Sequence, residues 1–188
     1  EVATVYESEL KDNQKAIDAY NHVLELDPDD LTAIQRLDHL YSTQGNWQEL
    51  LTILEREAEL AGDPNEICAY RYRVAQLHEK HLDGTARAVD IYREILEVIP
   101  DHEPSLTALT AILHGDKEPI AAAAVLEPVL TSAEAYDKVV DVLEVQLRHA
   151  EDDIRRVELL HRIAEISEAV LEQPANALNA YARAVPSD

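Results

Sequence analysis

The sequence AIDAYNHVLELDP at residues 16–28 returns as AVDIYREILEVIP at residues 88–100 and begins again as ALNAYARAV at residues 177–185. Each copy has a small residue, a tyrosine four positions later and a run of aliphatic residues, and the two complete copies end in proline. Residues four apart share one face of a helix, so the alanine permits close approach of a neighbouring helix and the tyrosine fills the space beside it. Proline helps to end the helix. Such a helix cannot bury its apolar side alone, so the copies must stack, with most of each tyrosine ring in the core.

The composition favours helix along the whole chain. The 188 residues include only four glycines, and alanine, leucine, glutamate, glutamine and arginine are frequent. The pattern predicts an all-α protein of about eleven helices, and connections of about two to five residues make consecutive helices antiparallel neighbours. Among these helices we expect one at 118–131, with a kink or an early stop at Pro128, followed by two at 135–150 and 153–172. We expect the chain to be a fragment of a longer protein, since it lacks methionine and begins in a helical pattern.

The formal net charge is −22, from 38 acidic and 16 basic residues that are spread along the chain. This charge indicates a solvated surface or, as the alternative, an acidic groove for a basic partner. It argues against direct nucleic-acid binding, which needs a basic face to contact phosphates. No apolar run reaches the roughly 18 residues of a membrane span. The single cysteine, Cys68, excludes an internal disulfide and a cysteine-based zinc cluster.

The repeated stretches have unequal spacing. Ala88 follows Ala16 by 72 residues, whereas Ala177 follows Ala88 by 89 residues, and the longer offset aligns 47–99 with 136–188 without a gap. We interpret the difference as one extra helix inserted between Pro100 and Tyr136, with the alanine-rich segment 118–131 as the candidate. The insertion predicts an irregular joint near 115–136 within a single domain 1–188. After the joint we expect either an exchange of inner and outer helices or, as the alternative, a three-helix layer near 104–150 that absorbs the extra helix.

The small residue, the aromatic residue four later and the proline eight beyond it resemble the tetratricopeptide repeat family, which stacks 34-residue helix–turn–helix units. The preceding helix also fits the family pattern at Ile34, Leu37 and Tyr41, but Asp38 stands where the family has a small residue. The resemblance implies a right-handed α-solenoid of antiparallel helix pairs, a superhelix. It also implies a noncatalytic protein–protein interaction scaffold that binds a peptide or protein segment on the helical-repeat surface and needs no cofactor.

A groove-facing stripe is predicted from the same resemblance as the candidate partner-binding surface: Gln35, His39, Ser42, Thr107 and Ala111. Family members that clamp a carboxylate use lysine, arginine and asparagine on this side. The stripe here has no lysine or arginine to bind a carboxylate, so this chain is not expected to act as a clamp of that kind.

The sequence predicts no catalytic, metal-binding or cofactor-binding residue, and hence no enzyme. His78 and His81 are three apart, where a zinc-binding helix needs four, so we interpret them as a surface pair. Cys68 is interpreted as a packing residue, and the acidic pairs at helix starts as caps. Two alternatives to the scaffold stay open: a peptide-sensing regulatory domain of a signalling protein, and a helical support domain of a larger enzyme. Oligomeric state and compartment are also open, with the cytoplasm favoured.

Overall fold

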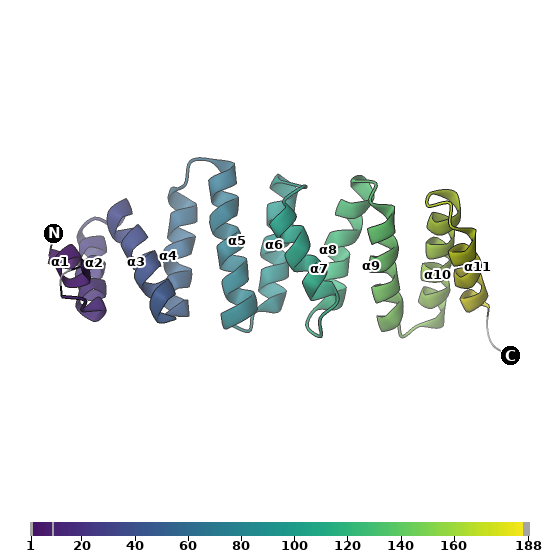
Figure 1. The fold of residues 1–188 in the computed structure, drawn as a ribbon, viewed down its shortest axis with the longest axis horizontal. Coiled ribbons are helices and arrows are strands. Elements are labelled where there is room, and N and C mark those ends of the chain that lie inside the picture. Colours follow the sequence, from purple (N-terminus) through teal and green to yellow (C-terminus); the bar gives the residue numbers. More distant parts are fainter. Residues whose placement is uncertain (1, 9, 186–188) are drawn as a thin grey trace. The chain divides into compact units, whose positions relative to one another are not determined.

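The computed structural model describes residues 2–8 and 10–185. Within that part the regular structure is entirely helical, which confirms the all-α prediction of about eleven helices (Figure 1). No helix in the described part is both long and apolar enough to span a membrane. The helices are α1 Val2–Ser8, α2 Asn13–Leu26, α3 Leu31–Gln44, α4 Trp47–Leu60, α5 Pro64–His81, α6 Thr85–Val98, α7 Glu103–Leu113, α8 Pro119–Ser132, α9 Tyr136–His149, α10 Asp153–Ala169 and α11 Pro174–Ala184.

Aspartates at the helix starts satisfy amide groups that the helix itself leaves unpaired. The Asp30 side chain accepts from the backbone N–H of Ala33 at 2.8 Å, and Asp63 and Asp152 each accept from two amides of the following turn. The interpretation of Asp30 and Asp152 as caps is therefore confirmed. At the other end of α3, Gly45 adopts φ 74°, a conformation that glycine reaches without strain.

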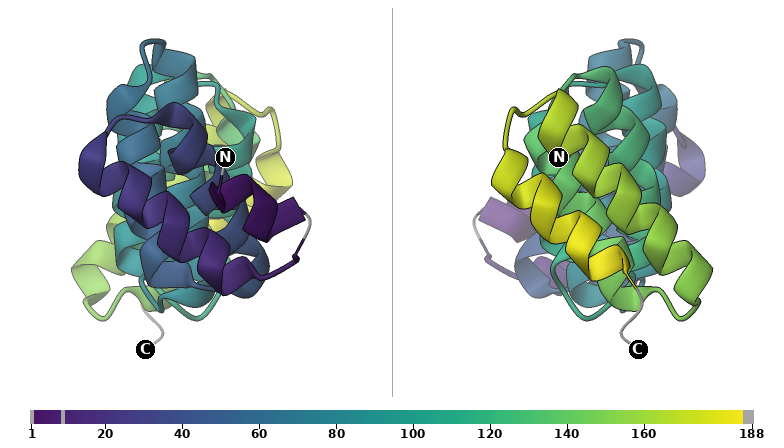
Figure 2. Two further views of the ribbon diagram at one scale, coloured as in Figure 1. Left: turned by 90° about the vertical axis from the view of Figure 1, so that its left-hand side faces the viewer. Right: turned by 90° about the vertical axis from the view of Figure 1, so that its right-hand side faces the viewer.

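The chain forms two compact units, unit 1 at Glu1–Ile91 and unit 2 at Tyr92–Asp188, with the boundary inside α6. In each unit the helices that pack on one another are sequence neighbours, such as α4 with α5 and α10 with α11. Figure 1 shows α4 and α5 antiparallel, and the right panel of Figure 2 shows α10 and α11 side by side. The single domain and the irregular joint near 115–136 stay predictions.

The helix bounds extend the internal duplication beyond the aligned sequence. Helices α9, α10 and α11 each begin 89 residues after α4, α5 and α6, and α7 and α8 begin within one residue of the same offset from α2 and α3. The left-handed residues also recur at this offset, Gly45 with Glu134 and Asp83 with Glu172. Two five-helix copies, α2–α6 and α7–α11, therefore account for the register with no inserted helix, and α8 is the counterpart of α3. The exchange of inner and outer helices stays a prediction.

The core follows the repeated stretch, with one correction. Ala16, Ala88 and Ala177 are buried, as are Tyr20 and Tyr92, but Tyr181 is 37% exposed. The expectation that all three tyrosines lie mostly in the core is therefore wrong for Tyr181. Helix α2 is flanked by α1 and α3, whereas in the described residues α11 packs on α10, so one side of its tyrosine lacks a neighbouring helix.

Pro128 does not end its helix, so of the kink or early stop that was predicted the early stop is wrong and the kink stays a prediction. Helix α8 continues to Ser132 with Pro128 inside it. A proline in a helix leaves the carbonyl four residues earlier without its partner. That residue is Ala124, which is exposed, so water can satisfy the carbonyl and the helix can continue.

Candidate partner-binding grooves

A groove of about 510 Å³ lies within unit 2 against α7, α8 and α9. Its floor is formed by apolar side chains that include Leu126, Leu130 and Val142, all of them buried. Polar groups stand at its rim, where His114 Nε2 lies 2.9 Å from Asp141 Oδ2 and so joins the end of α7 to α9. We call this the unit 2 groove. An apolar floor with a polar rim suits a short polypeptide segment that inserts an apolar side chain.

A second groove, of about 420 Å³, lies within unit 1 against α2, α3 and α4. Leu24 and the buried Ile53 provide its apolar surface. Asn21 and Tyr41 join α2 to α3 across it, since Asn21 Nδ2 donates to the Tyr41 hydroxyl at 3.0 Å and that hydroxyl lies 3.3 Å from Asn21 Oδ1. We call this the unit 1 groove.

The two grooves are copies of one another. Seven of the eight residues that line the unit 1 groove have a counterpart 89 residues later that lines the unit 2 groove, so the likeness extends from helix order to the surface itself. The pairs are Asn21 and Thr110, Leu24 and Leu113, Glu25 and His114, Tyr41 and Leu130, Glu49 and Lys138, Thr52 and Asp141, and Ile53 and Val142.

The copies keep the apolar floor and change the charge. Exposed Glu25 and Glu49 line the unit 1 groove, and its basic residue Arg56 is bonded to Asp29 at 3.3 Å. The corresponding places in unit 2 hold His114 and Lys138. Glu103 and Asp141 also line the unit 2 groove, so acidic side chains exceed lysine and arginine by one in each lining, and the grooves differ in where the charges stand.

The five predicted surface residues lie in both units. Thr107 and Ala111 are exposed and line the unit 2 groove. Gln35, His39 and Ser42 are exposed on α3 but do not line the unit 1 groove, whose α3 residue is Tyr41. The structure thus brings two of the predicted residues together, and the α3 stripe stays a separate prediction.

The sequence analysis did not identify the residues that form the groove floors, although the 89-residue duplication contained a signal for them. Leu24 pairs with Leu113 and Ile53 with Val142 at the 89-residue offset, and each pair preserves an apolar side chain. The aligned segment began at Trp47, so half of the groove lay outside it. The offset alone could not show that these positions share a surface, because three helices contribute to each groove.

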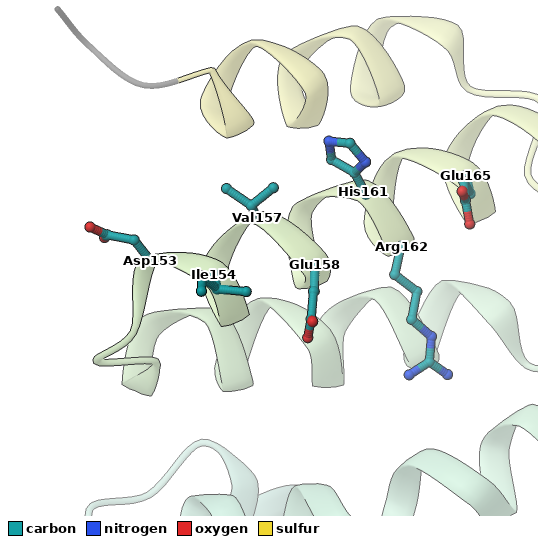
Figure 3. Close-up of a pocket in the computed structure, with 7 residues that line it drawn as sticks. All are labelled: Asp153, Ile154, Val157, Glu158, His161, Arg162 and Glu165. Atoms are coloured by element: carbon teal, nitrogen blue, oxygen red, sulfur yellow. The ribbon is translucent and has the colours of Figure 1, made fainter.

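A third hollow, of about 610 Å³, lies along α10 and is lined by residues of that helix alone (Figure 3). Val157 and His161 point towards α11, where the His161 ring meets the Tyr181 ring edge to face at 5.9 Å. Arg162 points the other way, to its ion pair with Glu127. Val157 is 36% exposed, whereas its counterpart Cys68 is 2% exposed. Burial of Cys68 confirms its interpretation as a packing residue.

The interpretation of His78 and His81 as a surface pair holds for His81, which is exposed, and is wrong for His78, which is half-buried. The His81 ring stacks on Trp47 with centroids 3.8 Å apart. His78 is half-buried beside Gly84, where a Cβ atom would lie 2.9 Å from His78 Nδ1, and burial lowers the pKa of its imidazole. Both rings therefore serve the packing of unit 1. In the described part of the chain, no group of three or more histidine, cysteine, aspartate or glutamate side chains is arranged to hold a metal ion.

Comparison with protein families gives one match, which lies over α3, α4 and the start of α5. Residues 33–67 match the sequence model of the tetratricopeptide repeat family. The chain therefore contains a tetratricopeptide repeat. Such repeats generally mediate protein–protein interaction and are generally noncatalytic. No curated protein matches this chain. The matched residues include Tyr41, Thr52 and Ile53 of the unit 1 groove.

Proposed function

We propose that this chain is a noncatalytic interaction scaffold that binds polypeptide segments in the unit 1 and unit 2 grooves. The duplication of seven groove-lining positions at one offset supports the proposal most directly. Two surfaces with the same apolar floor suit the same kind of ligand, namely an extended or helical segment with an apolar anchor.

The proposed partner is basic. The chain carries a net charge of −22, and acidic side chains stand at both grooves, Glu25 and Glu49 in unit 1 and Glu103 and Asp141 in unit 2. Complementary charge speeds association and selects partners, and it is weakened by salt. Both grooves should prefer basic segments, since acidic side chains outnumber lysine and arginine in each lining.

The test begins with selection of displayed random peptides on the whole chain. The selected peptides should be rich in lysine and arginine and should bind more weakly as salt rises. Ala111→Arg fills the unit 2 groove from an exposed position, and Thr52→Arg does the same in unit 1. Each variant should weaken its own class of peptide by roughly tenfold or more.

Ala124→Arg is the matched control, because Ala124 is exposed on α8 outside both grooves and the change adds the same charge. It should leave the affinities near those of the original chain. Selection of no peptide, or equal affinities for all three arginine variants, would overturn the proposal. The α3 stripe of Gln35, His39 and Ser42 is the alternative surface, and loss of binding in Gln35→Arg alone would favour it.

A further inference from the structure

Glu57 on α4 is a buried carboxylate without full compensation. The residue is 5% exposed, and its Oε2 atom has no hydrogen-bond partner among the described residues. The nearest cation is Arg73 on α5, whose Nη1 lies 3.8 Å from Glu57 Oε2. Arg73 is already held by Asp38 on α3 through two hydrogen bonds of 2.8 and 2.6 Å. One arginine therefore faces two carboxylates, of which Glu57 is buried and Asp38 is half-buried.

Unit 2 contains the same three positions with two changes, a longer acid in place of Asp38 and an amide in place of Glu57. At the 89-residue offset Asp38, Glu57 and Arg73 correspond to Glu127, Gln146 and Arg162 on α8, α9 and α10. Arg162 again bonds the acid, and Gln146 Nε2 donates to Glu127 Oε2 at 2.6 Å. Oε1 of Gln146 lacks a partner among the described residues, as Oε2 of Glu57 does. The second copy thus has a neutral donor where the first has an acid.

The side-chain amide of Gln146 and a protonated Glu57 carboxyl group have nearly the same shape, and both can donate one hydrogen bond to a carboxylate. The ionised acid cannot donate, and its charge is buried beside Asp38. The charged or titratable groups that face Glu57 are Asp38 from α3 and Glu66, Tyr70 and Arg73 from α5. Burial, then the charge of Asp38, raises the pKa of Glu57 to about 7, against the opposing effect of Arg73.

We propose that Glu57 is the proton-binding residue of a pH-sensitive joint between α3, α4 and α5. When protonated, Glu57 donates a hydrogen bond from α4 to Asp38 on α3, as Gln146 on α9 does to Glu127 on α8. When ionised, Glu57 cannot donate this bond, and the packing of unit 1 is loosened. Gln146 makes the equivalent joint in unit 2 insensitive to pH. The inference rests on the buried Glu57, on its neighbours Asp38 and Arg73 and on the duplicate of these three positions in unit 2. It is independent of the proposed function.

The sign of the effect follows from the raised pKa. The folded pKa of Glu57 lies above the value of the unfolded chain, so the stabilisation is fully present below the unfolded pKa and is lost as pH rises towards about 7. Relative to Glu57→Gln, the unfolding equilibrium constant of unit 1 should rise roughly 10- to 100-fold between about pH 5 and pH 8. Glu57→Gln should therefore raise stability at pH 8 and leave it almost unchanged at pH 5.

Trp47 reports on this unit, since it is the one tryptophan of the chain and opens α4. Urea unfolding of the whole chain, followed by Trp47 fluorescence at fixed pH values, gives a transition midpoint for each variant. Transition midpoints are compared rather than intensities, because the His81 ring stacks directly on Trp47 and influences its fluorescence intensity. As pH rises, the urea midpoint of the original chain should fall relative to that of Glu57→Gln. Parallel midpoints of the two proteins across this range would overturn the proposal.

The reciprocal exchange tests the same joint in unit 2. Tyr136 is the counterpart of Trp47, so Trp47→Phe with Tyr136→Trp moves the fluorescent probe to α9. In that background Gln146→Glu should introduce a loss of stability at pH 8 that is much smaller at pH 5, and an equal loss at both values would overturn the proposal.

A carbon-13 titration of the Glu57 carboxyl, with its signal assigned by its absence in Glu57→Gln, measures the protonation of this residue directly. A titration midpoint of Glu57 near that of an exposed glutamate would also overturn the proposal.

Discussion

Tyr92 and Tyr181 occupy the same place in two copies of one helical sequence, yet their surroundings differ. Tyr92 is fully buried, and Tyr181 is 37% exposed. The hydrophobic stabilisation from a side chain scales with the area that it removes from water, and loss of a buried ring also leaves a cavity. The identity of the residue is therefore a poor guide to its contribution to stability until its neighbours are known.

Tyr92→Ala should lower the free energy of unfolding by about 3–5 kcal/mol, the range for truncation of a fully buried aromatic side chain. Chemical unfolding of the whole chain, followed by circular dichroism, measures the loss. Tyr181→Ala is the matched control and should cost clearly less, because much of its ring already meets solvent and no comparable cavity forms. Equal losses in the two variants would contradict the burial difference between them.

Corresponding helices in the two copies are stabilised by the same kind of N-terminal cap. Asp63 caps α5 and Asp152 caps α10, each through amides two and three residues further on at 3.2 and 3.3 Å. The first amides of a helix have no intrahelical partner, so the cap compensates at the point where the helix is weakest. The caps thus fix the starts of both long helices in register with the duplication.

Asp63→Ala and Asp152→Ala should each lower the free energy of unfolding by about 1 kcal/mol. Trp47 fluorescence follows the first variant, and the tryptophan placed at position 136 follows the second. Asp153→Ala is the control within the first turn of α10, where the side chain does not serve as the cap. A loss in Asp153→Ala as large as that in Asp152→Ala would show that charge at the helix start matters more than the cap bonds.

The whole molecule carries a large excess of negative charge, −22 over 188 residues. Like charges repel one another in the compact state more than in the expanded chain, and salt screens the repulsion. Ion pairs between alternate helices oppose this effect, such as Arg36 with Glu7 and Arg183 with Glu144. With so few basic residues the repulsion should prevail.

Raising sodium chloride from about 10 mM to about 150 mM should therefore increase the urea midpoint of the chain, as the Debye length falls from about 30 Å to about 8 Å. The increase should level off at higher salt, since little repulsion is left to screen. A midpoint that falls with salt would mean that the ion pairs contribute more than the repulsion costs. A rise that continues in proportion to salt would indicate a general salting-out effect in its place.

Much of the fold followed from the sequence because it depends on local rules. Helix periodicity, acidic residues at helix starts and the repeated alanine–tyrosine stretch predicted the all-α architecture and the helices at 135–150 and 153–172. These features act within a few residues, so the chain itself displays them. The early stop, one of the two outcomes expected at Pro128, was wrong because the cost of a proline depends on whether the freed carbonyl meets water, which neighbouring helices decide.

The sequence by itself determined the helices, the tetratricopeptide character and the 89-residue duplication. Only the tertiary structure decided which duplicated positions meet. Three helices bring Leu24, Tyr41 and Ile53 into one groove, and another three bring Asp38 and Arg73 against Glu57. The distances that matter join residues about 15 to 35 positions apart, and their chemistry depends on exclusion of water, which no spacing along the chain expresses.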